Sequence, residues 1–333
     1  MNTNWLLVSK ERRLEILNQA SELTGLPGIA IEKDWWVSLC LNASFSLPYS
    51  KYLVFKGGTS LSKGWDLIER FSEDIDLALD RSYFGFYGDI SKTQIKKLRK
   101  QSCAFISTEF LRGLRQILTD WGAITDCSLF AQPGTESDKD PQVIEIHYNS
   151  VIDHSAYLPQ RVLLEISSRS LMEPTEEREI NSMLSMSFPK LDFVTDAFIV
   201  PTVLPQRTFL EKIFLLHEEF SLEPERIRID RLSRHLYDLE RLMDTKHGIE
   251  ALQDSALYHT IVGHREKFNA MRGLDYGNHK PEKINIIPPA AVIKAYENDY
   301  AAMTEFMIHG DALPFEKLMK RISELQARIN ELR

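Results

Sequence analysis

The chain has 333 residues, of which 43% are hydrophobic and 26% charged, as in ordinary globular proteins, so two packed units are expected. A net charge of −8 argues against a general nucleic-acid coat, although it is compatible with a local basic groove. The cysteines Cys40, Cys103 and Cys127 are too few and too widely spaced for a disulfide framework and indicate a reducing compartment. No apolar run approaches ~18 residues and the N-terminus lacks a signal pattern, so we expect a cytoplasmic protein without a membrane span.

The first part of the chain alternates between predicted helices and strands. Hydrophobic periodicity predicts helices over residues 9–24, 30–45, 60–68 and 92–118, and strands over residues 52–55, 74–80, 143–148 and 162–166. A polar loop is expected over residues 133–141, and the β content ends near Val200. In the strand over residues 74–80, Ile75, Leu77 and Leu79 share one face, and Asp74, Asp76, Ala78 and Asp80 share the other.

The second part of the chain is predicted to be helical. Apolar periodicity indicates helices over residues 208–220, 229–243, 250–269, 290–307 and 315–332. The proline-rich stretch over residues 201–205 marks the boundary between an α/β unit over residues 1–200 and a helical unit over residues 201–333. The fold class is therefore α/β, or α+β, followed by a helical half.

A glycine pair follows the first predicted strand. Gly57 and Gly58 allow a tight turn, and with Thr59 they would leave backbone N–H groups and a hydroxyl free at a helix start. Such a helix start suits a triphosphate, because it presents unpaired backbone N–H donors and the positive end of the helix dipole. A glycine pair alone is more often an ordinary turn.

Two aspartates follow about fifteen residues later, on one face of a strand. Asp74 and Asp76 would repel each other unless a cation lies between them, and Mg²⁺ takes one or two carboxylates completed by substrate phosphates and water. An Asp-x-Asp pair alone is usually a solvated strand face. Together with the glycine turn, it predicts in-line phosphoryl or nucleotidyl transfer.

The run GGTSLSKGW…RFSEDIDLAL resembles motif I of the DNA polymerase β-like nucleotidyltransferase superfamily, and within it the AbiEii/AbiGii-type toxin family. The second part of the motif matches at Arg70, Ser72, Asp74, Ile75, Asp76 and Leu77. The segment EKDWW over residues 32–36 is similar to one that such proteins carry near their start. The resemblance implies a polymerase β-like mixed sheet with flanking helices and a C-terminal helical domain that completes the nucleotide site.

The superfamily also implies a third carboxylate beside the metal, on a neighbouring strand. Glu165 in RVLLEISS lies at the matching place and is favoured because its strand is otherwise apolar. Glu145 in VIEIHY competes for the role, and a structural ion pair is the alternative for either one.

Two later segments resemble the remaining motifs of the family. Lys212 lies at the edge of an apolar helix face, where a snorkelling surface lysine is the usual explanation, but the resemblance implies that it contacts nucleotide phosphates. In RLSRHLYDLERLM, helical spacing places Arg231, Arg234, His235 and Asp238 on one face, with Asp238 as the final signature acid, expected to orient Lys212 or another basic group. The alternative for the arginines is a solvated helix face.

The resemblance thus implies catalytic roles for Asp74, Asp76, Glu165, Lys212 and Asp238, with the metal held by Asp74, Asp76 and Glu165. The nucleotide-binding set is Gly57, Gly58, Thr59, Arg70, Ser72, Lys212, Arg231 and Arg234. Arg70 could either touch the nucleotide or pin the turn.

The sequence therefore predicts a nucleotidyltransferase toxin of a toxin–antitoxin, phage-defence type of system, with two Mg²⁺ ions and an NTP as substrate. Resemblance implies an RNA acceptor, most plausibly a tRNA 3′ end, and a cognate antitoxin protein as partner. The basic helix start over residues 92–100 could contact RNA phosphates, although such a run is usually a solvated face. The alternatives are transfer to a small molecule or protein, and a non-catalytic nucleotide-binding module that docks an antitoxin.

Overall fold

The computed structural model describes residues 2–132, 140–153, 158–269, 271 and 273–332, so most of the loop expected over residues 133–141 lies outside the described residues. The chain forms two compact units. Unit 1 comprises Met1–Asp66 and Phe71–Val203, and unit 2 comprises Leu67–Arg70 and Leu204–Arg333. The short segment Leu67–Arg70 thus belongs with the C-terminal unit although it lies between two elements of unit 1.

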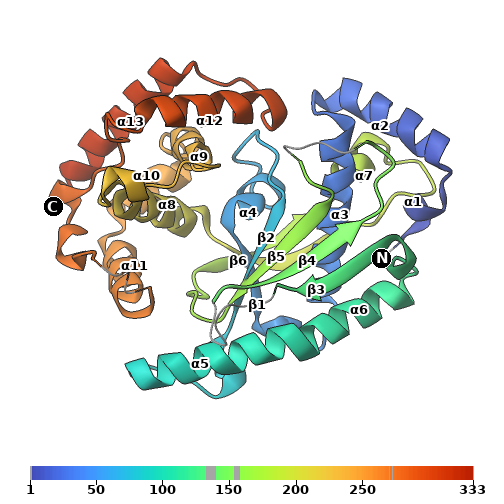
Figure 1. The fold of residues 1–333 in the computed structure, drawn as a ribbon, viewed down its shortest axis with the longest axis horizontal. Coiled ribbons are helices and arrows are strands. Elements are labelled where there is room, and N and C mark those ends of the chain that lie inside the picture. The colour runs from blue at the N-terminus through green and yellow to red at the C-terminus, as the bar shows by residue number, and fades with distance from the viewer. Residues whose placement is uncertain (1, 133–139, 154–157, 270, 272, 333) are drawn as a thin grey trace. The chain divides into compact units, whose positions relative to one another are not determined.

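Unit 1 is built on a seven-stranded mixed sheet with the strand order β3-β4-β5-β2-β1-β7-β6 (Figure 1). The pairs β2–β5 and β1–β7 are parallel, whereas the other neighbours run antiparallel. The strands are β1 (Leu53–Lys56), β2 (Asp74–Leu79), β3 (Cys127–Ala131), β4 (Gln142–Tyr148), β5 (Arg161–Ser167), β6 (Thr175–Ile180) and β7 (Phe198–Val203). The predicted mixed sheet with flanking helices is confirmed.

Alternating burial along two central strands separates an apolar sheet face from a polar one. Ile75, Leu77 and Leu79 of β2 are fully buried, as are the residues that share their face on β5, Val162, Leu164 and Ile166. The face assignment made from the sequence for β2 is therefore confirmed. Since side chains alternate along a strand, Asp74, Asp76 and Glu165 all lie on the opposite face.

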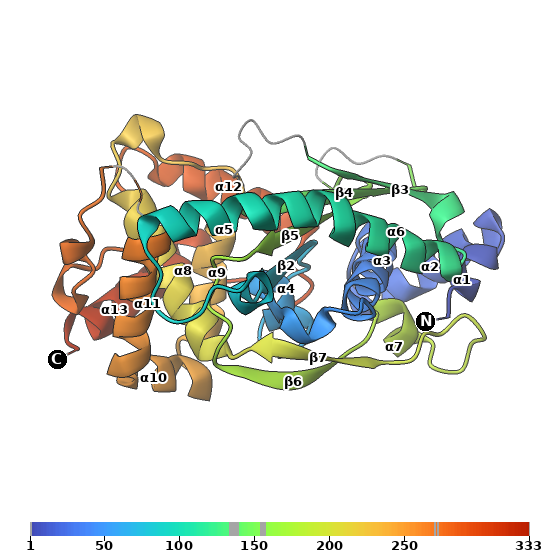
Figure 2. The same ribbon diagram turned by 90° about the horizontal axis from the view of Figure 1, so that it is seen from below.

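Helices cover the apolar face of the sheet. Trp36 on α3 stacks on Tyr148 of β4, with ring centroids 5.1 Å apart, and the Cys103 thiol donates to Gln142 of the same strand. The helices of unit 1 are α1 (Asn4–Leu7), α2 (Lys10–Thr24), α3 (Gly28–Phe45), α4 (Gly57–Lys63), α5 (Lys92–Phe105), α6 (Leu111–Asp120) and α7 (Met183–Ser187). A π-helical turn, Ile106–Phe110, joins α5 and α6 into the one long helix that the sequence predicted (Figures 1 and 2).

Three strands of the sheet were not predicted, and each lacks the usual signal. The strand β3 is short, and Phe130 within it is exposed. The strand β6 carries consecutive acidic residues, as edge strands often do. The strand β7 contains Pro201, which normally argues against a strand because proline has no N–H to donate to a neighbouring strand.

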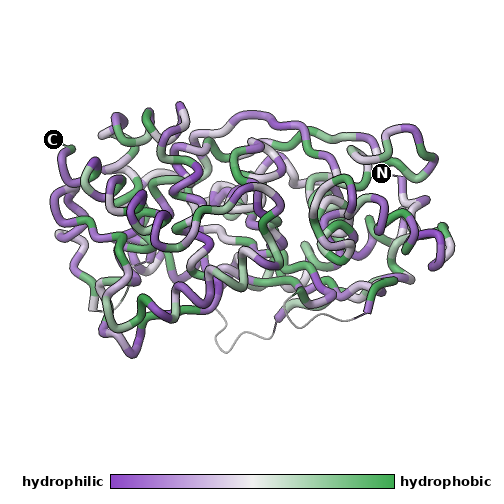
Figure 3. Tube along the Cα trace, turned by 90° about the horizontal axis from the view of Figure 1, so that it is seen from above, coloured by the Kyte–Doolittle hydropathy of each residue, from purple (hydrophilic) through white to green (hydrophobic). Residues whose placement is uncertain are grey.

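Unit 2 is helical, as expected. Its helices are α8 (Pro205–Phe220), α9 (Ser233–Leu242), α10 (Lys246–Gln253), α11 (Ser255–Phe268), α12 (Ile293–Phe306) and α13 (Phe315–Asn330). The helix expected over residues 250–269 is divided at Asp254, whose carboxylate caps α11 by accepting from the backbone N–H of Leu257. Hydropathy alternates every few residues along this part of the chain, as in amphipathic helices (Figure 3).

The segment Leu67–Arg70 is fastened within unit 2 by backbone and side-chain bonds. The Glu69 carbonyl oxygen accepts from the backbone N–H of His309 at 3.0 Å, and the Glu69 carboxylate pairs with Arg241 at 2.7 Å. Arg70 forms a β-bridge with Ile308. Among the described residues, none of the helices combines the length and the apolar character needed to cross a membrane.

Candidate active site

The Asp76 carboxylate lies directly against the backbone of Gly57. The strands β1 and β2 pair so that Lys56 stands opposite Asp76, and Gly57 follows at the end of β1 with a φ of +78°. A Cβ atom added at Gly57 would lie 2.0 Å from Oδ2 of Asp76. Two constraints therefore require glycine at this position: the left-handed backbone conformation and the lack of space for a Cβ atom.

The sheet register places Glu165, rather than Glu145, next to the aspartate pair. Glu165 on β5 stands opposite Asp76, whereas Asp74 stands opposite Leu163. Neighbouring strands lie about 4.8 Å apart, so Asp76 and Glu165 are adjacent on one face. Glu145 lies on β4, where it stands opposite Leu163 of β5 on the side away from β2. It is therefore one strand further from β2 than Glu165 is.

Glu145 is engaged in an ion-pair network of its own. Its carboxylate accepts from Gln132 at 2.6 Å, lies 2.7 Å from the His147 ring and 3.0 Å from Arg161. Although burial alone would raise the pKa of Glu145, these hydrogen bonds and the Arg161 charge lower it. The structural ion pair that the sequence allowed as an alternative thus describes Glu145.

The donor set fits Mg²⁺ as a substrate-bound ion rather than as an ion in a complete protein cage. Asp74 and Asp76 offer hard carboxylate oxygens on one side of β2, and the Asp76 carboxylate occupies the space that a Cβ atom at Gly57 would need. Within the described ranges, no three Asp, Glu, His or Cys side chains are gathered into a ready-made metal site. A pair of carboxylates completed by phosphate oxygens and water is the usual coordination of Mg²⁺.

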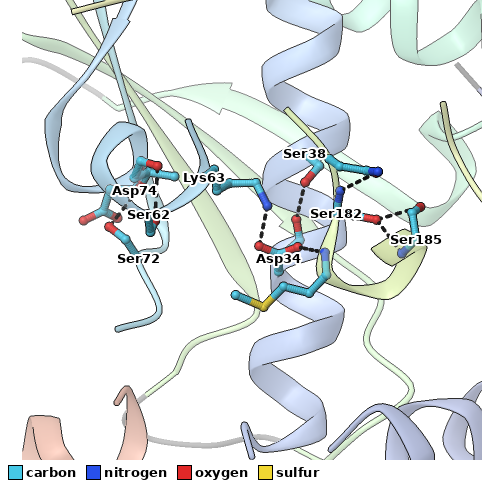
Figure 4. A network of polar contacts seen from close by, with 11 residues as sticks. Asp34, Ser38, Ser62, Lys63, Ser72, Asp74, Ser182 and Ser185 are labelled. Carbon is cyan, nitrogen blue, oxygen red and sulfur yellow. Dashed lines mark hydrogen bonds and ion pairs between the residues drawn. The ribbon is translucent and has the colours of Figure 1, made fainter. Parts of the chain in front are cut away.

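The hydroxyl of Thr59 is not free, contrary to the expectation from the sequence. Thr59 is fully buried, and its hydroxyl donates to the carbonyl oxygen of Asp74 and shares a 2.9 Å hydrogen bond with the hydroxyl of Ser72. Figure 4 shows the two partners, Ser72 and Asp74, close to each other. Thr59 therefore joins the first turn of α4 to the start of β2 through its side chain.

A buried charge cluster lies within unit 2, around Asp238 of α9. Asp238 accepts two hydrogen bonds from the Arg70 guanidinium, at 2.7 and 2.8 Å, and pairs with Lys212 of α8 at 2.8 Å. Lys212 also donates to Nδ1 of His235 at 3.2 Å. The Lys212 side chain is 7% exposed, so the snorkelling surface lysine considered from the sequence is wrong.

The cluster shifts the pKa of each member in a direction set by burial and by its neighbours. Burial alone would raise the pKa of Asp238, but Arg70 and Lys212 hold it well below its usual range. Burial lowers the pKa of Lys212, and Asp238 opposes that effect. Burial and the Lys212 charge depress the pKa of His235, which is therefore neutral and accepts from Lys212.

The arrangement of the basic residues differs from the single helix face expected from the sequence. Arg231 precedes α9 in a left-handed conformation, with φ of +58°, and its backbone N–H donates to Asp299 at 2.8 Å. Arg234, His235 and Asp238 lie on α9, but the last two are buried rather than solvated. The Arg70 guanidinium holds Asp238. The two roles that the sequence offered for Arg70, a nucleotide contact or pinning of the turn, stay predictions.

Lys56 is a residue of this region that sequence reasoning did not single out. Its Nζ lies 3.8 Å from Oδ1 of Asp76, and its side chain is 19% exposed. The signal for it was its position immediately before the glycine pair, which by itself does not distinguish it from any strand-end lysine.

A mixed sheet that carries paired aspartates beside a glycine turn is the framework of a nucleotidyltransferase. The family model for the nucleotidyl transferase AbiEii toxin of type IV toxin–antitoxin systems matches residues 41–321. The chain therefore belongs to the AbiEii toxin family.

Two solved structures resemble the chain at low identity. JHP933 from Helicobacter pylori has 18% identity and a TM-score of 0.39, with 91% of this chain and 98% of that chain covered. A candidate nucleotidyltransferase from H. pylori has 15% identity and a TM-score of 0.38, with 88% and 92% covered. Likenesses of this strength carry no weight for the function of the chain. The comparison with curated proteins gave no match.

Alanine at Gly57 is predicted to disturb both folding and the aspartate pair. Gly85 has the same φ of +78° but open space around it, so Gly85→Ala isolates the conformational cost, about 1–2 kcal/mol. Gly57→Ala should lower the free energy of unfolding further, because its Cβ collides with Asp76. Urea unfolding of both variants checks this, and equal losses would contradict it.

Removal of the Asp238 charge is predicted to destabilise unit 2 strongly. Asp238→Asn removes the buried carboxylate charge with which Arg70 and Lys212 both pair, at a cost of about 3–5 kcal/mol. Because the folded chain lowers the pKa of Asp238, its contribution is present above the unfolded value of about 4 and is lost as the pH falls further.

Urea unfolding at a series of pH values measures this contribution. The stability of the wild type should fall more steeply than that of Asp238→Asn between about pH 5 and pH 2. Parallel curves for the two proteins would show that the carboxylate does not contribute in this way.

Proposed function

We propose that the chain is a metal-dependent nucleotidyltransferase toxin that transfers nucleotides from an NTP to an RNA acceptor in the cytoplasm. The observation that carries this proposal is the Asp74–Asp76 pair on the polar face of β2, with Asp76 against Gly57. Membership of the AbiEii family supports the transferase class and implies a cognate antitoxin partner. A role in phage defence is part of the proposal.

In this proposal Asp74 and Asp76 hold Mg²⁺, with Glu165 on the adjacent strand as a further acid and two ions in all. Bound metal supplies charge neutralisation on the phosphates and alignment of the transferred group. The backbone N–H groups of Gly57 and Gly58 would hold the β- and γ-phosphates, because neither residue has a side chain of its own in the way. Thr59 keeps this turn and the start of β2 together.

In this proposal Lys212 of unit 2 contacts the phosphates of the nucleotide, as the resemblance to the family implies. Its bond to Asp238 would fix the ammonium group in one place, because the carboxylate is itself held by Arg70. Ser72, Arg231 and Arg234 complete the nucleotide-binding set that the resemblance implies.

The proposed acceptor is RNA, and within RNA the 3′ end of a tRNA. Supporting this, α5 presents an exposed row of cations on the side opposite its buried residues, and cations of this kind bind nucleic-acid phosphates. These exposed residues are Lys92, Lys96, Lys97 and Lys100.

The transfer of label from NTPs tests the proposed function. Purified protein incubated with Mg²⁺, each α-³²P-labelled NTP and total RNA should label tRNA, and Asp76→Asn should reduce the transfer by at least about 10²-fold. Asp196→Asn, in an exposed loop, is the matched control and should retain wild-type activity. Label in protein or metabolites would favour a different acceptor, and nucleotide binding without transfer would favour a non-catalytic module.

A pair of variants distinguishes the two glutamates that compete as the third acid. Glu165→Gln should lower label transfer about 10-fold or more, whereas Glu145→Gln should leave it nearly unchanged, because Glu145 is one strand further from Asp74. The same assay measures both. Loss of transfer in Glu145→Gln with full activity in Glu165→Gln would reverse the assignment.

A further inference from the structure

Helix α3 carries three consecutive ionisable residues, and all three are buried. Glu32, Lys33 and Asp34 are each no more than 1% exposed. They lie outside the region matched by the family model, residues 41–321. Charged side chains are rarely buried unless each finds a partner, so the function of this turn lies in the partners it holds.

Each of the three side chains binds a different segment of unit 1. Glu32 accepts from the backbone N–H of Val151 at 3.0 Å. Lys33 pairs with Glu73 and donates to the carbonyl oxygen of Pro159, two residues before β5, at 2.9 Å.

Asp34 accepts from Lys63 at 2.5 Å and from the backbone N–H of Met183 at 2.7 Å. Figure 4 shows Lys63 reaching Asp34, with Ser38 and Ser182 beside them. Lys63 is the last residue of α4, so the helix that begins with the glycine pair is tied to α3 at its end.

These bonds hold the chain on both sides of the excursion, the segment Leu67–Arg70 that belongs to unit 2. The chain leaves unit 1 after Asp66 and returns at Phe71. Lys63 lies just before the excursion and Glu73 just after it, and consecutive residues of one helix hold them. Asp74, the first of the paired aspartates, follows Glu73 directly.

Stability alone is a poor reason for this arrangement. Removing two charges from water costs several kcal/mol for each ion, and apolar replacements of buried pairs are often neutral or stabilising. Buried pairs do, however, fix one geometry. We propose that Lys33 and Asp34 are positioning residues, which set Asp74 and the glycine turn in register for a divalent cation; this rests on the proposed function.

The matched control is the buried pair of Glu218 and Arg265 in unit 2. Arg265 donates to Glu218 at 2.7 Å through Nε. The side chain of Arg265 is 14% exposed and that of Glu218 is 3% exposed. Arg265→Met therefore breaks a buried pair, as Lys33→Met does, at a residue with no proposed role in metal binding.

The experiment is a titration of the full chain with Mn²⁺, with free Mn²⁺ followed by electron paramagnetic resonance and folding by thermal melting. Both Lys33→Met and Arg265→Met should lower Tm. Only Lys33→Met should weaken Mn²⁺ binding, by roughly 10–100-fold, as expected for a residue that orients metal ligands. Lys33→Arg, which keeps the charge, should recover part of the affinity.

Glu73→Gln is a milder test, because it keeps the shape and a hydrogen-bond acceptor, and it serves if Lys33→Met does not fold. Wild-type Mn²⁺ affinity in the folded Lys33 and Glu73 variants, or an equal loss in Arg265→Met, would overturn the positioning role. If Asp76→Asn abolishes binding while these variants bind normally, only the positioning role fails. A wild-type chain that binds no Mn²⁺, either alone or with a non-hydrolysable NTP analogue present, would overturn both this role and the metal-dependent function.

Discussion

The close approach of Asp76 to the backbone of Gly57 is the constraint on which the proposed chemistry depends. A carboxylate can lie there because residue 57 has no Cβ and adopts a left-handed conformation that glycine accepts without strain. The antiparallel pairing of β1 and β2 fixes which residues meet, and the parallel pairing of β2 and β5 adds Glu165 beside Asp76. The sheet register, rather than flexible side chains, thus gathers the acids on one face.

Charges buried inside each unit hold the segments that carry the proposed functional groups. In unit 1, two residues of α3 hold Lys63 and Glu73, on either side of the excursion. In unit 2, Asp238 holds Lys212 and Arg70, and Arg70 lies within that excursion. Buried ion pairs of this kind add little net stability, whereas removing one partner is costly.

Sequence patterns predicted the elements in which local periodicity and burial agree. The alternation in β2 predicted its two faces, and apolar spacing predicted the long helix of α5 and α6 and most helices of unit 2. Edge strands such as β6 were missed, because a strand rich in glutamate follows its position in the sheet and not its composition. The excursion of Leu67–Arg70 was also missed, since it depends on partners far along the chain.

The candidate site was predicted in its residues more than in its contacts. The sequence identified Asp74, Asp76 and Asp238, but a pattern of residues cannot reveal that the Thr59 hydroxyl is already occupied or that Lys212 is buried. The most direct measurement of the central claim is anomalous diffraction from crystals grown with Mn²⁺ and a non-hydrolysable NTP analogue. The account predicts a Mn²⁺ peak within about 2.0–2.4 Å of carboxylate oxygens of Asp74 and Asp76. A peak bound to other residues, with these two carboxylates left without metal, would contradict it.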